Sequence, residues 1–133
     1  MNEANRESLR RAVARWNAGD VESALELASE DLRWYPGRDV FPDLDELYEG
    51  KQEVRESFAS FLEPWERIDV NVLEEEEIGD EIVVRALLCA RSREGVDVNI
   101  ELGQRWSFRD GLLWRYRGYS TYAEAREAAT AAP

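Results

Sequence analysis

The chain has 133 residues, of which 44% are hydrophobic and 35% charged, a length and composition typical of one globular domain. Its formal net charge of -12 argues against nucleic acid as a partner, because binding to a polyanion requires a surplus of cations. With one cysteine, Cys89, and no histidine, the sequence excludes an intramolecular disulfide and a zinc site built from Cys and His.

Membrane and cofactor motifs are also missing from the sequence. No stretch approaches the roughly 18 apolar residues of a membrane-spanning helix, and residues 1–15 are too polar for a secretory signal. The phosphate-binding patterns G-x-G-x-x-G and G-x-x-x-x-G-K do not occur, and a metal site made only of carboxylates has no supporting motif. We therefore expect a cytoplasmic protein with no membrane partner, cofactor or metal.

Two amphipathic helices are predicted at the N-terminus. Residues 3–18 carry apolar side chains at helical spacing, and Gly19 stands where such a helix would stop. Asp20 can cap a second helix, which we expect to end near Ser29. A short strand over residues 32–35 follows.

A long acidic and aromatic loop, residues 38–50, interrupts the regular pattern. A connection of about a dozen residues in a compact domain is often functional, so this loop is either part of a site or a solvated connection. Helical spacing then returns up to Pro64, and the rest of the chain alternates as strands do. The elements expected here are a helix over 51–63, strands over 68–72, 82–93, 96–108 and 112–120, and a helix over 122–129.

Helices followed by a meander of long strands indicate an α+β fold rather than alternating βαβ units. We expect one domain, residues 1–133, in which the N-terminal helices pack on a curved and mainly antiparallel sheet. Such a sheet and its helices would enclose a cone.

Three short motifs occur in a characteristic order: Trp16-Asn17-Ala18-Gly19-Asp20, Tyr48-Glu49-Gly50-Lys51 and Trp106-Ser107-Phe108-Arg109-Asp110-Gly111. Together they resemble the SnoaL-like polyketide cyclase family of the nuclear transport factor two-like superfamily, over residues 6–128. The resemblance implies a cone-shaped, cystatin-like α+β roll with a mixed sheet. It does not imply one reaction, because the superfamily includes isomerases, cyclases, dehydratases, epoxide hydrolases and noncatalytic binding proteins.

Strand register decides which residues face the interior of the cone. Glu94-Gly95 suits a two-residue turn for the first long hairpin. That register puts Arg85 opposite Gln104, on a face that also carries Trp106. Because this face is the more apolar and aromatic one, we assign it to the concave side beneath the helices.

The second hairpin is predicted to turn through a three-residue loop, residues 109–111, with glycine in the left-handed conformation. This loop would pair Trp106 with Trp114 and Gln104 with Tyr116. A two-residue Asp-Gly turn would shift the pairing. We prefer the longer loop because it keeps the aromatic residues on one wall.

The cone would thus be walled by tryptophans, with a few polar groups beside them, as in sites for small hydrophobic molecules. The expected ligand-binding residues are Trp16, Trp34, Arg85, Gln104, Trp106, Trp114 and Tyr116. The resemblance supports Trp16, Trp34, Gln104 and Tyr116, whose matching places line the steroid pocket in related ketosteroid isomerases. The alternative is that the tryptophans only fill the core and that Arg85 pairs with a carboxylate.

The resemblance does not extend to the catalytic residues of those isomerases. Their aspartate base, buried acid and helix tyrosine correspond here to Pro36, Gln104 and Ala12, and none of these can take over proton transfer. Candidate acids over the mouth of the cone are Asp39, Asp43 and Asp45, which either act in catalysis or are simply solvated. Cys89 lacks a neighbouring histidine and is expected to be an inert, buried thiol.

Two functions remain open from the sequence. The first is binding of a small hydrophobic molecule in the cone, with or without cyclase, isomerase or hydrolase chemistry on a carbonyl-containing or polycyclic compound. The second is a noncatalytic association module that forms a homodimer through the exposed face of its sheet. The residues expected on that face are Leu88, Leu113 and Tyr119 among Arg105, Arg115 and Arg117.

Overall fold

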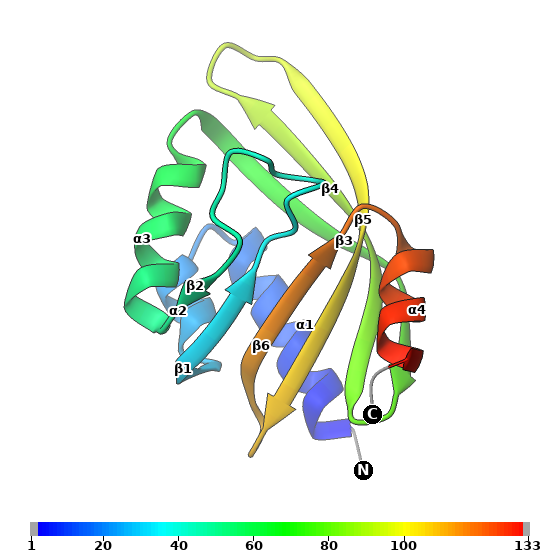
Figure 1. The fold of residues 1–133 in the computed structure, drawn as a ribbon. Helices are drawn as coiled ribbons and strands as arrows, with labels where there is room; N and C mark the ends of the chain where they lie inside the picture. The colour runs from blue at the N-terminus through cyan, green and yellow to red at the C-terminus, as the bar shows by residue number, and fades with distance from the viewer. Residues whose placement is uncertain (1–2, 132–133) are drawn as a thin grey trace.

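The computed structural model describes residues 3–131, within which four helices pack on one six-stranded sheet (Figure 1). The helices are α1 (Glu3–Asn17), α2 (Val21–Leu25), α3 (Lys51–Leu62) and α4 (Tyr122–Ala131). The strands are β1 (Ala28–Tyr35), β2 (Tyr48–Glu49), β3 (Trp65–Ile78), β4 (Glu81–Ser92), β5 (Asp97–Arg109) and β6 (Leu112–Tyr119).

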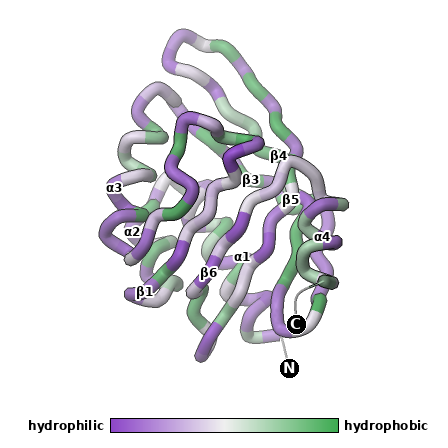
Figure 2. Tube along the Cα trace, viewed as in Figure 1, coloured by the Kyte–Doolittle hydropathy of each residue, from purple (hydrophilic) through white to green (hydrophobic). Residues whose placement is uncertain are grey.

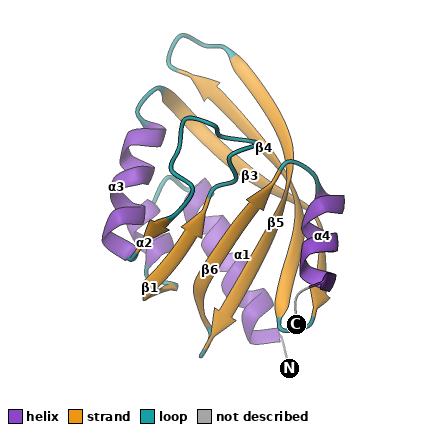
Figure 3. Ribbon diagram, viewed as in Figure 1, coloured by secondary structure: helices purple, strands orange, loops and turns teal. Residues whose placement is uncertain are grey.

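The strands lie in the order β2-β1-β6-β5-β4-β3, and all neighbouring pairs are antiparallel except β1 and β6, which are parallel. Helices α1, α2 and α3 cover one face, here called the inner face, and α4 packs on the opposite, outer face (Figure 3). The predicted α+β class, with helices on a mixed and mainly antiparallel sheet, is confirmed.

The inner face carries the main core. Along the first half of β5, hydrophobic residues alternate with hydrophilic ones (Figure 2), as expected where the two faces of a sheet differ. The largest fully buried side chains of this core are Leu9, Leu32, Val54, Ile82, Val84 and Leu102, contributed by two helices and three strands. Within residues 3–131, no helix is both long and apolar enough to cross a membrane.

The beginning of the chain differs from the sequence prediction at α2. This helix, capped by Asp20 through a hydrogen bond from the backbone N–H of Ser23, ends at Leu25 instead of near Ser29. Strand β1 begins three residues later because Ala28 is buried against β6, opposite Leu113. Tertiary pairing with a distant strand therefore overrides the local helical pattern.

Strand β3 is longer than predicted because it continues through four consecutive glutamates, residues 74–77. Such residues are depleted in strands, but all four of them here pair with arginines. The shortest N–O distance is 2.7 Å for Glu74 with Arg85, Glu75 with Arg6 and Glu76 with Arg126, and 2.9 Å for Glu77, which also pairs with Arg6. Ion pairs to a helix or a neighbouring strand thus accompany an extension that the residue types alone do not favour.

The β4–β5 hairpin turns through three residues, 93–95, and not through the predicted two. The backbone N–H of Ser92 donates to the carbonyl of Val96 at 2.8 Å, and Gly95 adopts the left-handed conformation with φ of 89°. The predicted register is therefore wrong by one residue: Val84 lies opposite Gln104, and Arg85 moves to the outer face. A slip of one residue exchanges the two faces of a strand.

The β5–β6 hairpin shows the converse difference. It turns through two residues, Asp110 and Gly111, whose φ values of 53° and 80° fit the turn that matches the strand twist. Trp106 lies opposite Tyr116, and a bulge beside Ser107 shifts the register before the turn. Trp114 falls in this bulge, so the predicted pairings of Trp106 with Trp114 and of Gln104 with Tyr116 are wrong, and Gln104 lies opposite Gly118.

Candidate functional site

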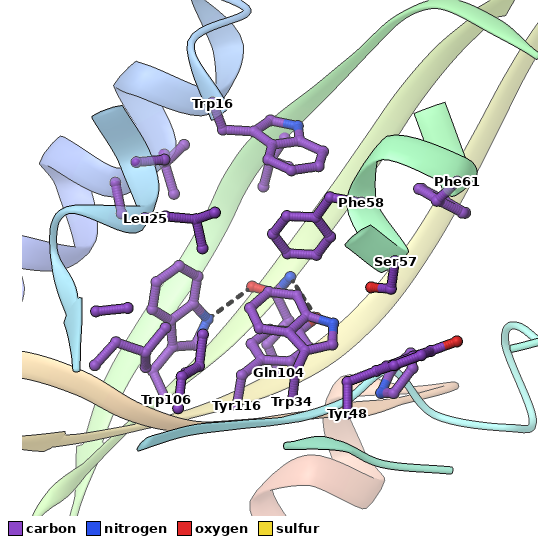
Figure 4. A pocket seen from close by; sticks show the side chains of 18 of the residues that line it. Trp16, Leu25, Trp34, Tyr48, Ser57, Phe58, Phe61, Gln104, Trp106 and Tyr116 are labelled. Carbon is purple, nitrogen blue, oxygen red and sulfur yellow. Dashed lines mark hydrogen bonds between the residues drawn. The ribbon is translucent and has the colours of Figure 1, made fainter. Parts of the chain in front are cut away.

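An apolar cavity of about 130 Å³ lies between the inner face of the sheet and helices α1, α2 and α3 (Figure 4). The loop between β1 and β2 supplies another part of its wall. The lining consists of Ala12, Val13, Trp16, Ala24, Leu25, Ala28, Leu32, Trp34, Pro36, Phe41, Leu44, Tyr48, Ser57, Phe58, Phe61, Ile68, Val70, Leu88, Leu102, Gln104, Trp106, Leu113 and Tyr116. No residue in this lining carries a formal charge.

Aromatic rings make up the centre of the pocket. The ring of Trp34 stacks on that of Tyr116, with centroids 3.9 Å apart and planes inclined by 11°. Phe58 meets Trp16 and Trp34 edge-on, at centroid distances of 5.2 and 4.9 Å. These rings come from α1, α3, β1 and β6, so the pocket exists only when the helices are packed on the sheet.

Side-chain hydrogen bonds hold Trp16 and its neighbour Asn17 against the edge strand β3. The indole Nε1 of Trp16 donates to the carbonyl of Ile68 at 2.9 Å. The amide of Asn17 accepts from the N–H of Val70 at 2.7 Å and donates to the same residue's carbonyl at 2.9 Å. The polar atom of Trp16 is thus engaged by the backbone, and its ring helps to line the cavity.

A directed hydrogen-bond relay forms the polar part of the pocket (Figure 4). The indole Nε1 of Trp106 donates to Oε1 of Gln104 at 3.0 Å, and Nε2 of Gln104 donates to the hydroxyl of Tyr116 at 2.9 Å. Because an indole N–H can only donate, it fixes the orientation of the amide. The Tyr116 oxygen therefore accepts, and its own proton points to no acceptor among residues 3–131.

Burial keeps the Tyr116 hydroxyl protonated. Tyr116 is 5% exposed, and burial raises its pKa well above the ordinary value of 10, more than the hydrogen bond from Gln104 lowers it. The group is thus a neutral donor over the whole physiological range. A neutral donor surrounded by apolar rings is suited to bind an uncharged acceptor such as a carbonyl oxygen.

The structure brings together Trp16, Trp34, Gln104, Trp106 and Tyr116 around the cavity, as the sequence suggested; their binding role stays a prediction. Arg85 and Trp114, by contrast, lie on the outer face. Arg85 forms ion pairs with Glu74 and Glu101, and the guanidinium groups of Arg109 and Arg115 lie 3.8 and 4.5 Å from the ring centre of Trp114. The predicted inward orientation of Arg85 and Trp114 is therefore wrong, and both errors come from hairpin register.

Two leucines and a thiol are also placed differently from the prediction. Leu88 and Leu113, expected on the exposed face, line the cavity. Cys89, expected to be buried, is half-buried, with its sulfur 3.4 Å from the side-chain nitrogen of Asn71.

The loop predicted over 38–50 contributes to the site through apolar residues and not through its acids. Phe41 and Leu44 line the cavity, and Phe41 meets Phe61 of α3 edge-on at 5.3 Å. The three aspartates of the loop, by contrast, are exposed and outside the lining. The apolar residues Phe41 and Leu44, which stand among those acids in the sequence, could have indicated that this loop forms part of the cavity wall.

Comparisons with known proteins agree with this fold. The model of the SnoaL-like domain family matches residues 9–116. No match to the chain was found among curated proteins.

Three similar solved structures illustrate the range of the fold. TerC, co-crystallised with polyporic acid, superposes with a TM-score of 0.79 at 20% identity, covering 96% of this chain and 98% of that one. RV0760c from Mycobacterium tuberculosis, in complex with estradiol-17beta-hemisuccinate, has a TM-score of 0.75 at 21% identity, with coverages of 87% and 92%. A putative SnoaL-like polyketide cyclase from Jannaschia sp. CCS1 has a TM-score of 0.72 at 20% identity, with coverages of 98% and 94%.

Proposed function

This chain belongs to the family of SnoaL-like domains, and we propose that it binds a small, uncharged, largely aromatic molecule whose acceptor oxygen meets the hydroxyl of Tyr116. The observation that carries this proposal is the relay from Trp106 through Gln104, which leaves the tyrosine proton free for a ligand. Similar structures hold polyporic acid and an estradiol derivative, which supports binding of cyclic, oxygen-bearing molecules.

The charge of the ligand follows from the lining. A buried ion without a charged partner is strongly disfavoured, and no residue that lines this cavity carries a charge that could pair with it. An uncharged ketone, quinone or phenol therefore fits better than a carboxylate inserted into the pocket.

The size of the ligand follows from the volume. A cavity of about 130 Å³ is close to the ~150 Å³ apolar cavity that holds one benzene molecule. A polycyclic ligand would need more space than this cavity offers. In the loop that carries Phe41 and Leu44, the backbone N–H groups of Val40 and Phe41 both bond to the carbonyl of Gly37, and the ring of Phe41 contacts Phe61 of α3.

The lining argues for binding rather than for proton-transfer catalysis. It includes no carboxylate, lysine or histidine that could act as a base, and Tyr116 stays protonated. Tyr116 could polarise a carbonyl, but cyclase, isomerase or hydrolase chemistry would need a base from outside these residues. Such chemistry is therefore the weaker part of the proposal.

Matched ligand pairs test the role of Tyr116. Acetophenone and ethylbenzene, and the larger 1-tetralone and tetralin, differ mainly in a carbonyl oxygen, so calorimetric titration of each pair isolates the hydrogen bond. We expect the ketone of each bound pair to be preferred by roughly fivefold, the contribution of one hydrogen bond. Tyr116→Phe should abolish this preference and leave hydrocarbon binding unchanged. Equal affinity for ketone and hydrocarbon in the wild type, or binding of neither pair, would contradict the proposal.

A homodimer through the outer face is the second candidate. Trp114 on that face lies beneath two arginine side chains, and aromatic and arginine residues are enriched at interfaces. The inward orientation of Leu88 and Leu113 removes part of the apolar surface expected there. Sedimentation velocity at micromolar concentration tests this candidate: a monomer throughout would exclude it, and a dimer lost in Trp114→Ser would support it.

The cytoplasmic location also stays a prediction.

A further inference from the structure

A second cluster of polar side chains lies on the outer face, across the sheet from the pocket. Its centre is Glu81 of β4, whose side chain is 7% exposed, beside Arg105 of β5, whose side chain is 4% exposed. Arg105 donates to Oε1 of Glu81 through Nε at 2.9 Å and through a terminal nitrogen at 2.7 Å. Both donors go to the same carboxylate oxygen, so this buried ion pair leaves Oε2 of Glu81 to other partners.

The other oxygen of Glu81 is shared by three further groups. Oε2 accepts from the hydroxyl of Ser107 at 2.5 Å and from a terminal nitrogen of Arg117 at 3.3 Å. A terminal nitrogen of Arg115 lies 3.7 Å away, beyond hydrogen-bond distance. One carboxylate thus faces three guanidinium groups, in a chain whose net charge is -12.

Arg115 and Arg117 are incompletely paired. The Nε atoms of both side chains are buried and have no hydrogen-bond partner. Buried polar atoms in folded proteins almost always have a partner, so two orphaned N–H donors on neighbouring guanidinium groups need an explanation.

The electrostatics agree with a missing negative charge. Burial lowers the pKa of Arg115, and the nearby charges of Arg117 and then Arg105 lower it further, against the opposite effect of Glu81. Register places Arg33 of β1 next to Arg115, and Tyr35 next to Arg117. Arg33 adds a further cation there, and it already engages the carboxylate of Glu49 and the Tyr35 hydroxyl, so neither residue supplies the missing negative charge.

We propose that the side chains of Arg115 and Arg117 form an oxyanion site on the outer face, which accepts a carboxylate, phosphate or sulfate group through the unpaired Nε–H donors. Guanidinium groups bind such planar or tetrahedral oxyanions through paired N–H donors. The negative charge would offset the excess of cations around Glu81. The site does not depend on the pocket, which lies on the other face of the sheet.

Two sources could supply the anion: a free ion, or the carboxylate of another protein chain. An isologous dimer centred on this cluster would bring arginines of the two copies together, and their positive charges would repel each other. The anion is therefore either a free ion or a carboxylate of a copy whose interface is not centred on the cluster. Titration with inorganic phosphate and sedimentation in phosphate-free buffer separate these sources. Saturable phosphate binding by a monomer assigns a free ion, and a dimer that phosphate dissociates assigns a protein carboxylate.

The sharpest readout is the pair of Nε–H groups themselves. Phosphate is titrated into ¹⁵N-labelled protein at constant ionic strength, with chloride as the balancing salt, while the arginine Nε–H resonances are followed. We expect saturable shifts at Arg115 and Arg117. Shifts that do not saturate, or that are equal at the exposed Arg67, would overturn the proposal.

Substitutions provide an independent test by calorimetry. Arg117→Gln should weaken phosphate binding about tenfold, because a charged hydrogen bond and one cation are lost, whereas Arg67→Gln should leave it unchanged. Arg115→Gln should abolish the binding of phosphate. It should not lower the free energy of unfolding in phosphate-free buffer, because it also removes a positive charge that repels its neighbours. Retention of wild-type affinity by both Arg115→Gln and Arg117→Gln would exclude this site.

Discussion

The side-chain amide of Gln104 donates a hydrogen bond to the hydroxyl of Tyr116 across 2.9 Å, on adjacent strands beneath the helices. Trp106 determines the direction of this hydrogen bond, because its indole N–H donates to the oxygen of the same amide. A donor-only group at one end of a short relay thereby determines which atom is offered to the pocket at the other end.

Gln104→Leu should destabilise the fold by about 1–3 kcal/mol, because the buried indole N–H of Trp106 loses its acceptor. The free energy of unfolding from urea titration measures this change. Gln52→Leu, at an exposed position on α3, serves as the control and should change stability by much less. Equal effects of the two substitutions would show that the relay contributes nothing to stability.

The assignment of residues to the two faces can be tested by binding. Arg85→Gln and Trp114→Phe should leave the affinity for acetophenone unchanged, because both side chains lie on the outer face. Trp34→Leu should weaken it, because the ring that stacks on Tyr116 is lost. Calorimetry is preferable to fluorescence here, since two of the variants remove a tryptophan. A loss of affinity in Arg85→Gln comparable to that in Trp34→Leu would contradict the assignment.

Glu81→Gln should cost about 3–5 kcal/mol, because it leaves the buried guanidinium of Arg105 without its carboxylate. Glu94→Gln, in the exposed β4–β5 turn, is the matched control. Thermal unfolding of both variants in the same buffer checks the prediction, and a small change in Glu81→Gln would show that the ion pair is dispensable.

The same carboxylate predicts a loss of stability in acid. Burial alone raises the pKa of Glu81, but the hydrogen bonds from Ser107 and Arg105, together with the positive charges of Arg105 and Arg117, outweigh it and hold this pKa below the ordinary value of 4.5. A group whose pKa is lowered on folding stabilises the protein above the unfolded pKa. That stability should therefore decline as the pH falls from about 4.5 through the pKa of the folded state. Glu81→Gln should lack this part of the decline, and an unchanged acid profile would exclude Glu81 as its source.

Asn17→Ala should destabilise the domain by about 1–3 kcal/mol, because two hydrogen bonds between α1 and the backbone of Val70 are lost. Amide hydrogen exchange should show faster exchange at Val70 in particular. Asn99→Ala, at an exposed position on β5, is the control. Unchanged exchange at Val70 would mean that packing alone holds the helix on the edge strand.

Gly103→Ala should loosen α4. A Cβ atom at this position would lie 2.4 Å from the carbonyl oxygen of Thr121 and 2.9 Å from Cβ of Ala125, so the helix start must move. We expect a cost of about 1–3 kcal/mol, with faster amide exchange confined to α4. Gly19→Ala, which has no atom within 4 Å but a φ of 81°, should lower stability through backbone strain and leave α4 unaffected.

Turn residues show where sequence reasoning could have succeeded and where it could not. Arg93-Glu94-Gly95 and Arg109-Asp110-Gly111 are nearly the same tripeptide, yet the first forms a three-residue loop and the second a two-residue turn. The second turn holds Asp110 at a positive φ, which Asp adopts more readily than Glu, so this difference was available from the sequence. The bulge beside Ser107 was not, because it depends on contacts across strands.

The sequence by itself determined the α+β class, the family and the order of helices and strands apart from the short strand β2, which lies within the predicted loop 38–50. These features follow from local periodicity and from motifs read within short segments. It also placed Trp16, Trp34, Gln104, Trp106 and Tyr116 at one pocket. Only the tertiary structure decided that Arg85 and Trp114 face away from it. The physical reason is that side chains alternate along a strand, so one residue gained or lost in a turn or a bulge reverses the face of every residue beyond it.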